Sequence, residues 1–76
     1  MPAVVLYTKS GCHLCDQART MLVRSSPQLD FEEVDIASDT SLVSIYGERI
    51  PVLLRRDTGE ELAWPFQPEQ LNQFMR

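Results

Sequence analysis

Residues 8–15 read Thr-Lys-Ser-Gly-Cys-His-Leu-Cys and contain both cysteines of the chain, Cys12 and Cys15, with its only histidine, His13, between them. A short apolar run, residues 3–7, leads into this stretch, and a helical pattern leads out of it. A Cys-x-x-Cys pair at a turn from strand to helix is an arrangement in which a protein can form, break or transfer a disulfide. The stretch therefore predicts thiol–disulfide chemistry at the junction of a strand and a helix.

The apolar periodicity on either side of this stretch predicts the other elements. Strands are expected at residues 3–8, 31–36, 50–54 and 60–63, and helices at residues 12–24, about 39–46 and 68–75. A strand–helix–strand crossover makes a parallel pair, whereas the Asp-Thr-Gly turn at 57–59 makes an antiparallel hairpin. The order βαβαββα therefore predicts an α/β fold in one domain over residues 1–76, with a mixed four-stranded sheet flanked by three helices.

Some finer features of the helices follow from the same patterns. The first helix is expected to bury one apolar stripe, made of Leu14, Ala18, Met21 and Leu22. Arg19 falls on the polar side of that helix. The second helix is expected to be capped by Ser38 or Asp39, and to end at Gly47 in the left-handed conformation that glycine adopts without strain.

Composition and charge argue against several classes of partner. The chain has 76 residues and a formal net charge of −4 at pH 7, which argues against nucleic-acid and anionic-membrane partners. No apolar stretch approaches the roughly 20 residues that a membrane span needs. The N-terminus shows no basic region followed by a long apolar core, so we expect a cytoplasmic protein. We also expect a monomer. In that reducing compartment a disulfide is more often catalytic or sensing than structural.

Cys12 is the expected nucleophile, because the attacking species in disulfide exchange is a thiolate. It opens a helix whose unpaired N–H groups favour an anion, and Lys9 adds a positive charge nearby. Such settings lower the pKa of a cysteine from about 8.5 into a range of roughly 3.5 to 7.5. Asp16 acts in the opposite direction, but it can point to solvent, so a net lowering is expected. Cys15, one turn further, is expected to be more buried and to act as the resolving thiol.

Other interpretations of the cluster stay open. The cysteines could simply fill space in a core. They could bind a metal or an iron–sulfur cluster, but zinc normally takes four ligands, so Cys12, His13 and Cys15 would need a second chain or an external thiol to complete the set. The domain could also be a redox sensor or adaptor that oxidises reversibly without turnover. His13 is expected to point outward, with a hydrogen bond to the Cys12 thiolate or metal ligation as the alternatives.

Short segments in the right order resemble the glutaredoxin-like branch of the thioredoxin superfamily, namely Tyr7-Thr8-Lys9, Cys12-x-x-Cys15, Val34-Asp35, Tyr46-Gly47 and Ile50-Pro51-Val52. The resemblance covers nearly the whole chain and implies a thioredoxin-like fold, with Pro51 in the cis form beside the two cysteines. It also implies that Ile50 offers its backbone N–H and C=O to an extended substrate, as an added strand. An ordinary edge-strand start is the alternative for this dipeptide.

The resemblance extends only in part to the glutathione site. Lys9 matches a glutathione-contacting lysine in position, which makes glutathione a candidate co-substrate. His13-Leu14 replaces the Pro-Tyr of many glutaredoxins, and residues 62–66, Leu-Ala-Trp-Pro-Phe, lack the Gly-Gly turn that holds the glutathione tail. The chain looks most like short bacterial glutaredoxin-like proteins. We therefore expect an oxidoreductase with no bound cofactor or metal, a disulfide-containing protein or glutathione as partner, catalytic residues Cys12 and Cys15, and substrate-binding residues Lys9, Ile50 and Pro51.

Overall fold

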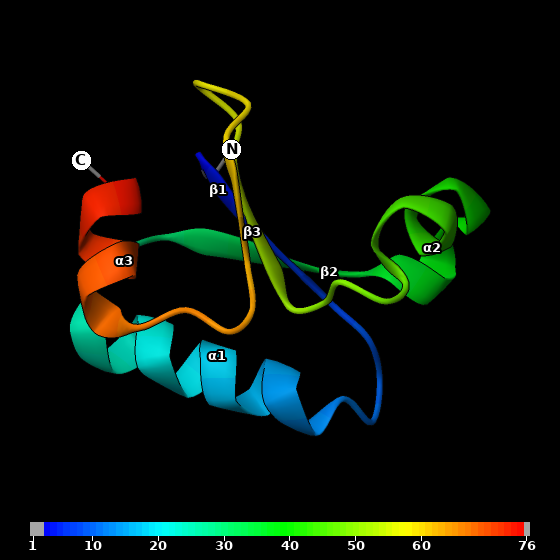
Figure 1. Cartoon of the computed structure of the whole chain (residues 1–76), viewed down its shortest axis with the longest axis horizontal. Coiled ribbons are helices and arrows are strands. Elements are labelled where there is room, and N and C mark those ends of the chain that lie inside the picture. Colours follow the sequence, from blue (N-terminus) through cyan, green and yellow to red (C-terminus); the bar gives the residue numbers. More distant parts are fainter. Residues whose placement is uncertain (1–2, 76) are drawn as a thin grey trace.

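Over residues 3–75, which are the residues that the computed structural model describes, four strands pair into one mixed sheet (Figure 1). The strands are β1 (Val4–Thr8), β2 (Phe31–Asp35), β3 (Val52–Arg55) and β4 (Glu61–Ala63). The helices are α1 (His13–Ser25), α2 (Thr40–Tyr46) and α3 (Pro68–Phe74), and a 3-10 turn, η1 (Ile36–Ser38), follows β2. The predicted order βαβαββα is confirmed within these residues, whereas residues 1, 2 and 76 of the expected domain lie outside the described part. No helix in the described part is long and apolar enough to cross a membrane.

The sheet has the strand order β2-β1-β3-β4, so β1 is an inner strand. It runs parallel to β2, with Val4 opposite Phe31, and antiparallel to β3, with Tyr7 opposite Val52. β4 returns antiparallel to β3 and forms one edge. An inner strand that is buried on both faces reads as a continuous apolar run rather than as an alternation, which is the pattern of β1.

α1 and α3 pack against each other on one face of the sheet (Figure 1). The core on this face consists of the buried residues Val4, Leu6, Ala18, Leu22, Leu53, Phe66 and Leu71. The sequence pattern also places Leu14 in this core, but 44% of Leu14 is exposed. That prediction is wrong because the buried stripe of α1 runs through Cys15, Ala18 and Leu22. Leu14 lies one residue before this stripe, which rotates its side chain by about 100° around the helix.

α2 packs against the opposite face, near the carboxyl end of β1. A second cluster forms there from Ile36, Tyr46 and Val52, with partly buried Tyr7 beside them. The rings of Tyr7 and Tyr46 are stacked, with their centroids 4.4 Å apart. Of the two expected caps of α2, the structure uses Asp39, whose carboxylate accepts a hydrogen bond from a backbone N–H of the first turn at 2.8 Å.

Gly47 ends α2 in a right-handed conformation, with φ −51° and ψ −35°. The prediction of a left-handed cap is therefore wrong. Space constrains this residue instead, because a Cβ here would lie 2.6 Å from the Val43 carbonyl oxygen. The left-handed conformation occurs at Gly11, with φ 80°, and at Gly59, with φ 77°. These two glycines lie in the turns that follow β1 and β3.

Candidate functional site

The turn between β1 and α1 brings the cysteines to one end of the sheet. Only residues 9–12 separate the two elements. Gly11 has a positive φ of 80°, and the Cys12 N–H donates to the Lys9 carbonyl oxygen at 3.1 Å. The chain therefore reverses within one tight turn, and Cys12 becomes the N-cap residue of α1.

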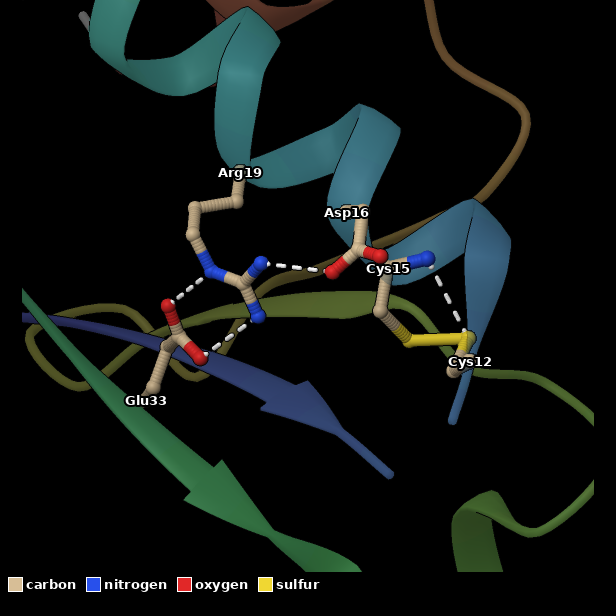
Figure 2. The surroundings of a disulfide bond; sticks show 5 residues. All are labelled: Cys12, Cys15, Asp16, Arg19 and Glu33. Carbon is tan, nitrogen blue, oxygen red and sulfur yellow. Dashed lines mark hydrogen bonds and ion pairs between the residues drawn. A yellow bond between two sulfur atoms is a disulfide. The ribbon is translucent and has the colours of Figure 1, made fainter. Parts of the chain in front are cut away.

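Cys12 and Cys15 form a disulfide, with 5.2 Å between their Cα atoms (Figure 2). The Cys15 N–H donates a hydrogen bond to the Cys12 Sγ at 3.1 Å. Cys12 is partly buried, whereas only 1% of Cys15 is exposed. The expected difference in burial is confirmed, so a partner molecule would reach Cys12 before Cys15.

The start of α1 favours a negative charge on Cys12 after the disulfide is reduced. The N–H groups of the first helical turn have no acceptor within the helix, and the Cys15 N–H already points at the Cys12 Sγ. A thiolate at this position would accept that hydrogen bond at the positive end of the helix dipole. One accessible sulfur that ionises readily, with a second sulfur within reach, is the pair of thiols that disulfide exchange requires.

Pro51 lies at the same end of the sheet as the cysteine turn. Because Tyr7 pairs with Val52 across β1 and β3, the residue before Val52 lies beside the end of β1. The peptide bond between Ile50 and Pro51 is cis. Pro51 is buried, and its carbonyl oxygen accepts a hydrogen bond from the Trp64 N–H at 3.0 Å. The structure thus brings together the cysteine turn and the proline that the sequence places 36 residues after Cys15.

The backbone of Ile50 is only partly available to a substrate. Its N–H donates to the Tyr46 carbonyl oxygen at 3.1 Å. The expectation that Ile50 offers both its N–H and its C=O is therefore wrong for the N–H. The Ile50 carbonyl oxygen has no such partner among residues 3–75, so it is the group that an extended substrate could use.

A hydrogen-bonded cluster holds the segment that leads into Pro51. The Tyr46 hydroxyl donates to one oxygen of the Glu61 carboxylate, and Arg49 Nη2 donates to the other at 2.9 Å. The Arg49 guanidinium also lies over the Tyr46 ring, 5.4 Å from its centroid. Burial, followed by the hydrogen bond to Glu61, raises the pKa of Tyr46 to about 12. In turn, the Tyr46 hydroxyl and Arg49 hold the pKa of Glu61 below its usual range.

Sequence reasoning misses this cluster. Tyr46 and Glu61 are 15 residues apart, and Arg49 and Glu61 are 12 apart. Tyr46 enters the sequence argument only as part of a family resemblance, and no local pattern indicates its partner in β4. A pairing of this kind becomes visible only when the sheet register is known.

Arg19 joins Asp16 to Glu33 near the disulfide (Figure 2). Arg19 Nη1 donates to Asp16 Oδ1 at 2.7 Å, and Nη2 donates to Glu33 Oε2 at 2.9 Å. Arg19 Nε donates to the other oxygen of Glu33. The hydrogen bonds to Glu33 and then to Asp16 raise the pKa of Arg19. The sequence places Arg19 only on the polar side of a helix, because its partner in β2 is 14 residues away.

Lys9 is exposed beside the cysteine turn, where it borders a polar hollow of about 360 Å³. The hollow is lined by Thr8, Lys9, Ser10, Gly11, Asp16, Arg19, Glu33 and Asp35. Within the described part of the chain, no carboxylate forms an ion pair with Lys9. Its ammonium group is therefore open to an anionic group of a substrate.

His13 is exposed, in agreement with the expectation that it points outward. It borders a second groove, of about 420 Å³, which runs along α1 and is walled by Met21 and Trp64. Trp64 also packs edge-on against the buried Phe66, with 5.0 Å between the ring centroids. Trp64 therefore packs at the rim of the core and also borders the surface beside the site.

The cysteine pair does not form a metal site by itself. Among residues 3–75, no three His, Cys, Asp or Glu side chains are grouped so that they could hold a metal ion. A metal ion or cluster on Cys12 and Cys15 would need further ligands from another chain or from an external thiol.

Comparisons with known proteins agree with this geometry. The family model described as "Glutaredoxin-like domain (DUF836)" matches residues 3–76. Uncharacterized proteins of Mycobacterium tuberculosis and Mycobacterium bovis are each 32% identical in an alignment of 77 positions that covers 92% of this chain and 78% of theirs. The X-ray structure of the structural genomics target protein XcR50 from X. campestris is 41% identical, with a TM-score of 0.86 over 96% of this chain and 95% of that one.

A more distant solved structure shares the fold. The glutaredoxin grx-1 from Archaeoglobus fulgidus has a TM-score of 0.69 and 23% identity, over 100% of this chain and 88% of that chain. The fold therefore agrees with that of a glutaredoxin, and the two cysteines lie at the start of the first helix. The chain belongs to the glutaredoxin-like domain family, and its Cys-x-x-Cys pair supports a thiol oxidoreductase-like role.

Proposed function

We propose that this protein is a small thiol–disulfide oxidoreductase with Cys12 as the nucleophile and Cys15 as the resolving thiol. The observation that carries the proposal is the unequal burial of two sulfurs that are near enough to close a disulfide, with 5.2 Å between the Cα atoms. The helix start stabilises a thiolate on the accessible sulfur. Burial protects the second sulfur from direct attack by solvent or by other thiols.

The proposed reaction consists of two exchange steps. The Cys12 thiolate attacks one sulfur of the substrate disulfide, that S–S bond breaks, and the other substrate sulfur leaves as a thiolate that takes up a proton. Cys15, after losing its own proton, attacks the Cys12 Sγ and releases the second substrate thiol. Two electrons pass to the substrate, and the cysteine pair is left as a disulfide. Two equivalents of an external thiol such as glutathione then reduce this disulfide to the two cysteine thiols, and they leave joined as their own disulfide.

We infer that the substrates are protein disulfides, or mixed disulfides of proteins with glutathione. The exposed Lys9 supports binding of a carboxylate beside the turn. The Ile50 carbonyl oxygen, next to Pro51, supports docking of an extended segment at the same end of the sheet. Glutathione enters as a co-substrate rather than as a resident cofactor. One copy of the chain supplies both thiols, so we propose that the protein works as a monomer.

Serine substitutions separate the roles of the two thiols. Cys12→Ser should reduce turnover of a protein disulfide to background, with either glutathione or dithiothreitol as the reductant. Cys15→Ser should still form a mixed disulfide at Cys12, seen by mass spectrometry as an adduct of the substrate thiol. His13→Ala is the matched control, because this exposed side chain lies between the cysteines and should be dispensable.

The proposal fails if Cys12→Ser turns over disulfides at the rate of the parent protein. Reversible oxidation of the parent without turnover would instead indicate a sensor or adaptor. A stoichiometric metal or an iron–sulfur absorption band after anaerobic purification would indicate the metal-binding alternative.

A further inference from the structure

Arg19 stands between the cysteine turn and the edge strand β2, with both sides of its guanidinium group occupied (Figure 2). Two of its nitrogens bond to the two oxygens of Glu33, and a third bonds to Asp16 at 2.7 Å. Figure 2 shows one oxygen of the Asp16 carboxylate directed at Arg19. The bidentate contact with β2 fixes the guanidinium, so the remaining nitrogen fixes the direction of Asp16.

The stability of the fold does not account for this arrangement. The side chains of Arg19 and Asp16 are 39% and 67% exposed, and exposed ion pairs of this kind stabilise proteins by only about 0 to 1 kcal/mol. Their position suggests a different role, because Asp16 follows Cys15 directly and lies one helical turn after Cys12. A carboxylate at that distance opposes a second negative charge on the Cys12 sulfur.

In the polar hollow beside the cysteine turn, carboxylates outnumber cations. Within the described residues, the polar hollow beside the turn is bordered by the carboxylates of Asp16, Glu33 and Asp35 and by the cations Lys9 and Arg19. Asp35 is engaged locally, since it accepts a hydrogen bond from the Ala37 N–H at 2.9 Å. The exposed His13 lies between the two cysteines on α1. Without Arg19, Lys9 would be the one permanent cation among the described residues that border this hollow, against three carboxylates.

We propose that Arg19 is a positioning residue for Cys12, which holds the Asp16 carboxylate away from the sulfur and compensates its charge, so that the thiolate forms at a lower pH. This inference rests on the proposed function, because it concerns Cys12 as a nucleophile. Arginine suits the role because its planar fork can bind one carboxylate with two nitrogens and still direct a third nitrogen at another. A lysine would supply the charge without this two-sided geometry.

The pH profile of Cys12 alkylation by iodoacetamide tests the inference. The measurement uses the reduced protein with Cys15→Ser in every sample, so that a single thiol reacts. Arg19→Gln should move the midpoint of the profile upward by about 0.5 to 1 pH unit, which is the effect of one uncompensated charge several ångströms away near the surface. Arg19→Lys should move it less, because the positive charge is retained.

Asp16→Asn provides the matched background, because it removes the charge on which Arg19 is proposed to act. In that background, Arg19→Gln should raise the midpoint by less than it does when Asp16 is present. An equal upward shift with and without Asp16 would overturn the inference, and so would no shift in either background.

The two proposals fail in different ways. If the parent protein reduces disulfides through Cys12 but Arg19→Gln leaves the midpoint unchanged, only the inference about Arg19 is wrong. If the parent protein does not reduce disulfides at all, the proposed function is wrong, and the turnover assay shows this without the Arg19 variants. Circular dichroism of each variant checks that a changed midpoint does not come from a lost fold.

Discussion

Tyr46, in the hydrogen-bonded cluster beside Pro51, should make the stability of the protein depend on pH, and the size of this effect can be calculated. Only 6% of Tyr46 is exposed, and its hydroxyl donates to Glu61. Burial and this hydrogen bond raise the pKa of Tyr46 to about 12, whereas a tyrosine in an unfolded chain ionises near about pH 10. Between these two values the unfolded state binds fewer protons than the folded state. The free energy of unfolding must therefore fall as the pH rises through this range.

The size of the effect follows from the two pKa values. The contribution of Tyr46 is fully present below about pH 10, is reduced by about 1.4 kcal/mol at about pH 11, and has lost about 2.7 kcal/mol well above about pH 12. Tyr46→Phe removes this titration together with the hydrogen bond. At about pH 7 the variant should be less stable than the parent protein by about 1 to 2 kcal/mol. The difference between the two proteins should shrink by about 1.4 kcal/mol at about pH 11.

Urea unfolding of the oxidised protein, followed by the fluorescence of Trp64, measures this difference, because the chain has a single tryptophan. Tyr7→Phe is the matched control, since it alters the only other tyrosine, which stacks on Tyr46. The control should keep the loss of stability at high pH. If the stability difference between Tyr46→Phe and the parent is the same at about pH 7 and about pH 11, the argument from burial and the Glu61 hydrogen bond is refuted.

Two further predictions concern the frame that positions the site. Leu22 is 0% exposed in the core, so Leu22→Ala should lower the free energy of unfolding by about 2 to 5 kcal/mol in urea titrations. The control is Val23→Ala, because Val23 is 54% exposed. This control should change the free energy of unfolding by less than about 0.5 kcal/mol. Gly47→Ala would place a Cβ 2.6 Å from the Val43 carbonyl oxygen and should cost about 1 to 3 kcal/mol. Calorimetry should show this as a melting temperature lower by roughly 4 to 8 °C per kcal/mol, and an unchanged value would contradict the steric argument.

Much of the fold can be predicted from the sequence because its signals are local. The apolar run of β1, the break at Gly11 and the periodicity after Cys12 each depend on residues a few positions apart, and together they place the cysteine pair at a helix start. Two predictions that are wrong, for Leu14 and Gly47, show what local signals do not determine. Leu14 has the right polarity for the core but the wrong angle around α1, since Cys15 occupies that stripe. A glycine after a helix predicts a left-handed cap, but Gly47 is right-handed. A glycine is needed there because the Val43 carbonyl oxygen leaves no room for a Cβ.

The surroundings of the two sulfurs depend on which elements meet in space. Arg19 reaches Glu33 because α1 lies on the face of the sheet toward which that side chain of β2 points, and Tyr46 reaches Glu61 because β4 adds to the edge of β3. The Ile50 N–H is taken by Tyr46, which no motif indicates. The sequence alone specifies which residues carry charge, sulfur or apolar surface. The distances between groups 14 or 15 residues apart are set by the register and packing of the whole sheet, and these distances determine how the cysteine pair is surrounded.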